Sequence, residues 1–234
     1  MLENSSTRRN FLRQTSIAGA GLLAPLALAQ QKAEEKEKGD DKISPAEDLM
    51  REHGVLNRIL LIYDHHLHLL GEKRPFDGSI LASAADIVRH FVEEYHEKLE
   101  EDFLFPRFRK AGKHVPLVET LQTQHKAGRD LTAKIRELGA TATLKYISSD
   151  TDKLGDALRS FLRMYRPHEA REDTVLFPAF RSIISPHEYD ALGEDFEKKE
   201  DELFGDEGFF KVVDQVAALE KKLGIYDLAQ FTPK

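Results

Sequence analysis

The chain of 234 residues contains no cysteine. This absence excludes disulfide bonds, iron–sulfur ligation, thiolate catalysis and a lipidated N-terminal cysteine. Any metal site must therefore use histidine and carboxylate side chains. The sequence also lacks an excess of basic residues, since its formal net charge is −7 at pH 7. Phosphate binding needs a basic face, so we expect no nucleic-acid partner.

The N-terminus lacks an apolar run long enough to span a membrane. Residues 16–29 are interrupted by glycine and proline, and a spanning helix needs roughly 20 apolar residues. Residues 7–12 (TRRNFL), with Arg8 and Arg9, resemble the twin-arginine export signal, and a small-x-small cleavage site ends at Ala29, before Gln30. We predict a cleaved signal peptide over residues 1–29. The twin-arginine machinery would then deliver the protein to the periplasm or the cell exterior, without stable membrane insertion after cleavage. An uncleaved signal that anchors the chain is the alternative.

Composition also divides the rest of the chain. Residues 30–43 mix acidic and basic side chains and offer little apolar surface to bury, which predicts a flexible charged linker. We place a helical bundle and the start of a fifth helix at residues 44–204. Residues 205–234 are expected to form a C-terminal helix and a tail.

Helical periodicity dominates the chain after residue 44. Residues 44–47 (SPAE) have the pattern of a helix start, with a capping serine, proline at the first helical position and a glutamate that can close a capping box. Apolar residues then recur at steps of four and three as far as Gly71. Similar stripes predict helices at about residues 77–110, 116–138 and 150–184, and no segment has the alternation of a strand. Residues 185–188 (SPHE) predict a fifth helix, and another follows Gly208. Short connections make neighbouring helices antiparallel, so the predicted fold class is all-α, an up-down-up-down four-helix bundle with additional C-terminal helices.

An internal repeat is the most informative feature. Residues 96–108 (HEKLEEDFLFPRF) align without gaps on residues 168–180 (HEAREDTVLFPAF), 72 positions later. His53 and His125, on the first and third predicted helices, are also 72 positions apart. The chain therefore consists of two similar helical hairpins. Each has one histidine on its first helix and a His-x-x-x-Glu pair on its second.

The spacing of these residues predicts one buried cluster. Residues four apart lie on the same face of an α-helix, so each histidine of a His-x-x-x-Glu pair points with its glutamate. Inward histidines and carboxylates on facing helices are how metal sites in helical bundles are built. A single buried histidine is more often a satisfied core residue, but a duplicated set is far more specific. The candidate metal ligands are His53, His96, Glu100, His125, His168 and Glu172.

Electrostatics favour two metal ions in this cluster. A buried charge without a partner costs several kcal/mol even after relaxation. Salt bridges with imidazole are one solution. Two divalent cations, bridged by Glu100 and Glu172 with two histidines on each, satisfy the charges better. This ligand set suits two iron ions first, and also manganese or zinc. Six ligands on two ions leave open positions where oxygen, nitric oxide, peroxide or water can bind.

Three neighbouring residues are candidates for supporting roles. Glu97 and Glu169 directly follow the ligand histidines and turn about 100° away on an α-helix. We expect them to support the site or to lie on the surface, with extra ligation as the alternative. Tyr165 lies one turn before His168 and is expected to pack in the core or to donate a hydrogen bond near the site.

The other histidines fall outside the repeat. His65, His66 and His68 form a cluster that we expect at a solvated helix end, with adventitious metal binding as the alternative. No histidine lies 72 positions from any of these three, nor from His90, His114 or His187.

The repeated motif resembles the hemerythrin-like family, also called the His-His-Glu cation-binding domain. The resemblance covers about residues 45–200 and rests on the six candidate ligands and the Leu-Phe-Pro after each pair. It implies a non-heme di-iron centre bridged by the two glutamates and an oxo or hydroxo group. Oxygen-carrying hemerythrins place two histidines one turn apart on the third helix, whereas Arg129 follows His125 here. The pattern is closer to the bacterial branch, whose roles include gas sensing, peroxide handling and iron binding.

Three functions fit this pattern. The favoured one is a binding module for oxygen, nitric oxide, peroxide or iron itself. The second is a di-iron oxidoreductase, which would need external electrons because the sequence has no flavin or nicotinamide fingerprint. The third is a metal that only stabilises the fold. Sensing is disfavoured because no separate signalling domain is evident in the sequence.

Overall fold

The computed structural model describes residues 43–141 and 149–233, and these residues form helices and no strand. The predicted signal peptide and all of the predicted linker except residue 43 lie outside the described residues. Within the described ranges, no helix combines the length and the apolar character needed to cross a membrane.

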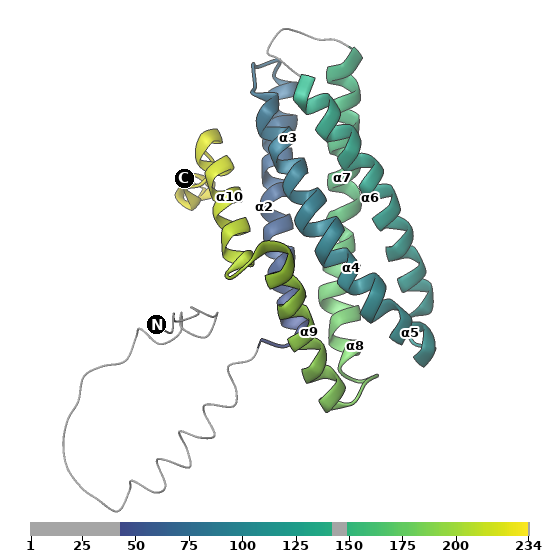
Figure 1. Ribbon diagram of the computed structural model, residues 1–234. Coiled ribbons are helices and arrows are strands. Elements are labelled where there is room, and N and C mark those ends of the chain that lie inside the picture. The colour runs from purple at the N-terminus through teal and green to yellow at the C-terminus, as the bar shows by residue number, and fades with distance from the viewer. Residues whose placement is uncertain (1–42, 142–148, 234) are drawn as a thin grey trace, which may run out of the picture.

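Four long helical runs form an antiparallel bundle, which confirms the predicted architecture (Figure 1). The four runs consist of these segments: α2 (Pro45–Gly71); α3 (Gly78–Ile87), η2 (Val88–His96), α4 (Glu97–Leu99), η3 (Glu100–Leu104) and α5 (Phe105–Ala111); α6 (Val115–Thr141); and α7 (Ser149–Arg171), η4 (Glu172–Leu176) and α8 (Phe177–Phe180).

Side-chain caps define where the helices begin. The Ser44 hydroxyl accepts a hydrogen bond from the Glu47 backbone N–H at 3.3 Å. Asp77 does the same for Ser79 at 3.0 Å, so the second run starts where the sequence predicts. A cap satisfies a backbone N–H that the first helical turn leaves without a partner.

The end of the fourth run differs from the prediction. The helix stops at Phe180, not at about residue 184, and the backbone N–H groups of Ser182 and Ile183 donate to carbonyls three residues earlier. The cause is the start of the next helix. Pro186 disfavours a helical conformation for Ser185, so the chain must leave the helix before it. Ser185 then caps α9 through the Glu188 N–H.

The second and fourth runs also contain π-helical turns that the apolar periodicity does not predict. Glu100 begins η3 and Glu172 begins η4, and the N–H of Phe105 or Phe177 donates to the carbonyl of that glutamate, five residues earlier. A proline follows each phenylalanine and has no N–H to donate four residues back. Single π turns inside α-helices are frequent at functional sites.

The C-terminal helices cover one side of the bundle. They are α9 (Pro186–Phe204), α10 (Gly208–Leu223) and the short η5 (Leu228–Phe231). Helix α10 lies along α2, and the Arg58 guanidinium on α2 bonds the Glu220 carboxylate on α10 at 3.0 Å (Figure 1). The candidate cluster lies deep within the four long runs, so these extra helices shield one side of the bundle that contains it.

Candidate metal centre

The structure brings all six candidate ligands together in the bundle interior. Each side chain comes from one of the four runs, and none exposes more than 4% of its surface. Their places are His53 on α2, His96 at the end of η2, Glu100 at the start of η3, His125 on α6, His168 on α7 and Glu172 at the start of η4.

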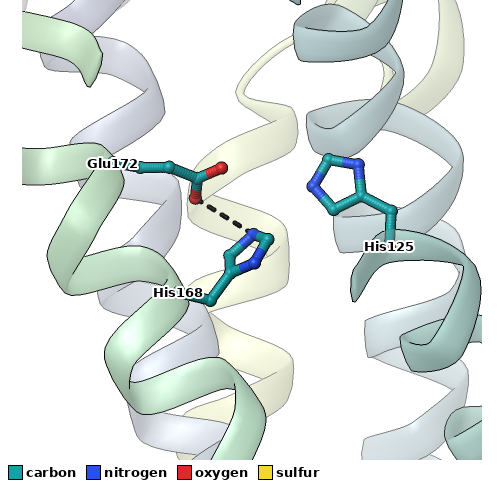
Figure 2. A group of neighbouring side chains, drawn as sticks. All are labelled: His125, His168 and Glu172. Atoms are coloured by element: carbon teal, nitrogen blue, oxygen red, sulfur yellow. Dashed lines mark ion pairs between the residues drawn. The ribbon is translucent and has the colours of Figure 1, made fainter. Parts of the chain in front are cut away.

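The four histidines form two pairs, one from each hairpin. His53 and His96 face each other with their Nε2 atoms 3.1 Å apart. His125 and His168 lie with ring centroids 5.1 Å apart. Figure 2 shows His125 reaching from α6 toward His168 and Glu172. The repeat in the sequence is therefore a repeat in the site.

Each glutamate lies between the two histidine pairs. The Glu100 Oε2 atom is 3.3 Å from Nε2 of His125 and 3.9 Å from Nε2 of His96. The Glu172 Oε2 atom is 3.2 Å from Nε2 of His168 and 3.4 Å from Nε2 of His53. Each carboxylate thus contacts one histidine of each pair. This is the placement that a bridging carboxylate requires.

A second set of side chains orients the histidine rings. The Nδ1 contacts are His53 to Asp173 at 2.7 Å, His96 to Glu52 at 2.7 Å, His125 to Glu101 at 3.1 Å and His168 to Gln124 at 2.8 Å. An acceptor at Nδ1 places the proton there and leaves the Nε2 lone pair facing the centre. All four imidazoles are therefore oriented as metal ligands.

Sequence reasoning missed this outer set, although the repeat contains its signal. Glu52 and Gln124 are 72 positions apart, and so are Glu101 and Asp173. Comparison of every polar position at this offset, and not only of histidines, would have found them.

The phenylalanines of the repeated motif also have a place in the site. Phe105 stacks on the His125 ring and Phe177 on the His53 ring, each with centroids 5.4 Å apart. The phenylalanine of each Leu-Phe-Pro therefore packs directly against a candidate ligand. The stacked rings exclude water from one face of each imidazole.

The charges in the cluster are tightly coupled. Burial would raise the pKa of Glu172, but His168 and His53 outweigh it and hold this pKa well below its usual range. Burial and the neighbouring Glu172 raise the pKa of Glu100. Burial would lower the pKa of His53, yet the carboxylates of Asp173 and Glu172 raise it well above its ordinary value. In the metal-free protein, bound protons on His53 and Glu100 thus balance part of the negative charge that metal ions would otherwise balance.

The donor set fits metal ions. Among the described residues, neither oxygen of Glu100 or Glu172 finds a hydrogen-bond partner, and neither does Nε2 of His125. Buried polar atoms almost always have partners, so such a concentration at one place needs a physical reason. Two divalent cations would satisfy these oxygens and nitrogens together. The absence of cysteine leaves imidazole and carboxylate donors, which suit iron, manganese or zinc.

Comparison with known proteins agrees with this geometry. Residues 44–180 match the family described as the hemerythrin HHE cation binding domain. The chain belongs to this family. A second match covers residues 116–206 and begins 72 positions after the first, in step with the repeat. The family description names cation binding, which is consistent with the cluster of histidine and glutamate side chains in the bundle interior.

The relatives found among curated proteins have no described function. Uncharacterized proteins of Mycobacterium bovis and of Mycobacterium tuberculosis are each 42% identical over 233 residues. The alignment covers 96% of this chain and 91% of the relative. No solved structure matches the sequence.

Glu97 and Tyr165 form a buried network beside the candidate ligands. The Tyr165 hydroxyl donates to Glu97 at 2.8 Å, and Arg129 contacts the other Glu97 oxygen at 2.9 Å. The Tyr165 ring lies 5.4 Å from the His168 ring, between centroids. A Cβ on Gly128 would overlap the Tyr165 hydroxyl, so glycine is required there. Tyr165 is thus buried in the core, and its hydroxyl is hydrogen-bonded to a carboxylate that lies beside the candidate ligands.

Glu169 occupies the equivalent place in the other half, but its neighbours differ. It accepts a hydrogen bond from Asn57 at 2.5 Å, and burial raises its pKa to about 8. Glu97 and Glu169 are each only 1–2% exposed, so neither is a surface residue. Both lie behind the candidate ligands.

One expectation about the remaining histidines is wrong. His66 is fully buried rather than solvated, and its Nδ1 bonds the Ile62 carbonyl at 2.8 Å. The helical turn places it on the core side of α2, three residues after the buried Tyr63. His68 is exposed as expected.

Proposed function

We propose that this protein is a non-heme di-iron protein that binds a small ligand, such as oxygen, nitric oxide or peroxide, or that binds iron itself as cargo. The observation that carries the proposal is the pair of glutamates, each lying within 3.2–3.9 Å of one histidine from each hairpin. Single-ion sites do not need two carboxylates placed between two pairs of imidazoles. A pair of ions that share both carboxylates needs this arrangement.

We favour iron, and the donor set argues against a structural zinc site. A structural zinc site is usually a closed tetrahedron and often contains thiolates, and this chain has no cysteine. Six protein ligands on two ions leave positions open for an external molecule. Iron bound there would supply reversible ligand binding and one-electron chemistry. Manganese and zinc remain alternatives that elemental analysis separates.

The chain's own residues prepare the site for such a ligand. The outer acceptors hold the four Nε2 lone pairs inward, and Phe105 and Phe177 shield two of the rings. The buried surroundings keep bulk water away, which strengthens electrostatic interactions within the site. These features favour binding of a small uncharged molecule over binding of a large substrate.

Metal stoichiometry tests the proposal directly. Native protein is expected to contain about two metal ions per chain, mainly iron. Elemental analysis should be combined with visible spectra before and after exposure to oxygen and nitric oxide. A preparation with intact ligands and fewer than one ion per chain would contradict the proposal. Two ions with no spectral response to either gas would favour a metal that only stabilises the fold.

A di-iron oxidoreductase is the second candidate, and Tyr165 favours it. Its hydroxyl is buried, bonded to Glu97, and its ring packs beside His168. Reduction of peroxide to two water molecules consumes two protons and two electrons, and an external reductant must supply the electrons. The Tyr165–Glu97 pair offers a buried group that can move a proton toward the centre.

The Tyr165→Phe variant separates this activity from simple binding. It keeps the ring and its packing but removes the hydroxyl that donates to Glu97. We expect peroxide reduction by a one-electron dye to slow by roughly tenfold or more, with metal content unchanged. If parent and variant reduce peroxide at the same rate, Tyr165 is a packing residue only.

We further propose that the protein is exported by the twin-arginine route. The proposal rests on Arg8 and Arg9 before a short apolar stretch and the small residues that end at Ala29. Replacing both arginines by lysine keeps the charge but removes the recognised pair. The variant is expected to accumulate inside the cell as an uncleaved precursor, measured by cell fractionation and intact mass. Normal export of the variant would contradict this assignment.

A further inference from the structure

The two histidine pairs differ in the charge that lies behind them. Behind the first pair, both Nδ1 atoms donate to carboxylates, His53 to Asp173 and His96 to Glu52, each at 2.7 Å. The carboxylate oxygens of Asp48 and Glu200 lie within 4.8 Å of Glu52 and add acidic groups to this side. Both Nδ1 atoms of the first pair thus face a carboxylate, and further acidic side chains lie nearby, one of which, Asp48, contacts Arg51 at 3.5 Å.

Behind the second pair, only one of the two Nδ1 atoms faces a carboxylate, although Glu97 also lies within 4.8 Å of Glu101 and His125. His125 donates to Glu101 at 3.1 Å, but His168 donates to the amide oxygen of Gln124 at 2.8 Å. Gln124 occupies the position that corresponds to Glu52 in the repeat. An amide fixes the ring orientation as a carboxylate does, yet it carries no charge.

The guanidinium of Arg129 further reduces the negative charge around the second pair. Arg129 contacts Glu101 at 2.7 Å and Glu97 at 2.9 Å. The position that corresponds to Arg129 in the first hairpin is Asn57, which is neutral and bonds Glu169. The second hairpin thus departs from the first at Gln124 and at Arg129, and both changes make the surroundings of the second pair less negative.

We propose that the two metal positions are inequivalent: the His53–His96 position binds its ion first and tightly, and the His125–His168 position is the weaker, exchangeable one. The inference rests on the proposed two-metal function. A carboxylate behind a histidine increases the electron density at Nε2 and strengthens its bond to a metal. Loss of such a partner typically costs 10–100-fold in metal affinity. Gln124 is therefore a positioning residue that sets the affinity of its side of the centre.

Titration of metal-stripped protein with Fe²⁺ under anaerobic conditions tests this inference. The full chain is expected to bind two ions in two steps whose dissociation constants differ by roughly tenfold or more. Mössbauer spectra of protein loaded with one equivalent of ⁵⁷Fe are expected to show mainly one doublet. A second doublet should appear only with the second equivalent.

The Gln124→Glu variant restores the missing carboxylate. It is expected to tighten the weaker step by roughly tenfold and to bring the two constants together. Gln124 is only partly buried, so the added charge can be accommodated. Gln122→Glu is the matched control, because Gln122 lies on the same helix but accepts from Arg109 rather than from a histidine. The control variant should leave both dissociation constants unchanged.

The reciprocal variant, Glu52→Gln, is expected to weaken the tighter binding step. It should also alter the Mössbauer parameters of the doublet that appears with the first equivalent of iron. Misfolding could lower affinity, but it could not tighten one step in Gln124→Glu while loosening the other in Glu52→Gln. Two ions bound with equal affinity in the parent would overturn this inference while leaving the two-metal function intact. Failure of Gln124→Glu to tighten the weaker step would overturn it in the same way. Binding of a single ion would overturn both.

Discussion

Replacing Glu100 or Glu172 by alanine is expected to empty both metal positions, and to do so to a similar extent. Each carboxylate contacts one histidine of each pair, so each substitution removes a ligand from both ions at once. The repeat places the two residues at equivalent positions, each at the start of a π turn. Bound iron should fall below roughly a tenth of the parent value at equal free metal, measured by elemental analysis after dialysis.

Two exposed histidines provide controls for this experiment. His90 contacts Glu94 on the surface, and His187 lies in the first turn of α9, away from the cluster. His90→Ala and His187→Ala should retain the metal content of the parent. Retention of two ions with an unchanged spectrum by both glutamate variants would rule out the bridging assignment, and Glu97 and Glu169 would then need the same test.

Removal of the metal is expected to lower the melting temperature by roughly 10–20 °C. An ion present at 100 times its dissociation constant stabilises the folded state by about 2.7 kcal/mol, and two ions contribute separately. For a chain of this size, each kcal/mol shifts the melting temperature by about 2–4 °C. Thermal unfolding followed by circular dichroism, with and without a chelator, measures the change. An unaltered melting temperature after complete metal loss would show that the ions do not couple to folding.

The same experiment has a pH-dependent arm in the metal-free protein. Burial and Glu172 raise the pKa of Glu100, so this carboxyl costs stability as the pH rises above its unfolded-state value. Metal-free Glu100→Gln is therefore expected to melt above the metal-free parent at pH 7, and at about the same temperature near pH 3, where the carboxyl is protonated in both the folded and the unfolded state. A variant that melts lower at both values would indicate that the hydrogen-bonding geometry of the site matters more than its charge.

Much of the fold follows from local sequence rules. The caps at Ser44 and Ser185 and the apolar stripes specify where the helices begin and which faces are buried. Short connections then leave little choice of topology. Two of the deviations have local causes that act through the backbone. Pro186 ends the fourth run early, and the prolines after Phe105 and Phe177 favour π turns that side-chain periodicity alone does not reveal.

The candidate site was predictable where residues share a helix and less so where they meet across helices. The spacing of His96 and Glu100 predicts that they point together, and the structure agrees. The contact between Gln124 and His168 depends on how α6 and α7 rotate against each other, which no local pattern specifies. His66 illustrates the same limit, because its burial is decided by packing against neighbouring elements rather than by its own polarity.

The contacts that cross between the two hairpins suggest how this centre evolved. Glu100 of the first hairpin reaches His125 of the second, and Glu172 of the second reaches His53 of the first. Each hairpin therefore presents half a centre whose missing half is a copy of itself. Such a surface is self-complementary under a two-fold rotation, which is the condition for an isologous dimer. A gene encoding one hairpin could have built this centre by homodimerisation, and its duplication and fusion would have freed positions such as 124 and 129 to change on one side only.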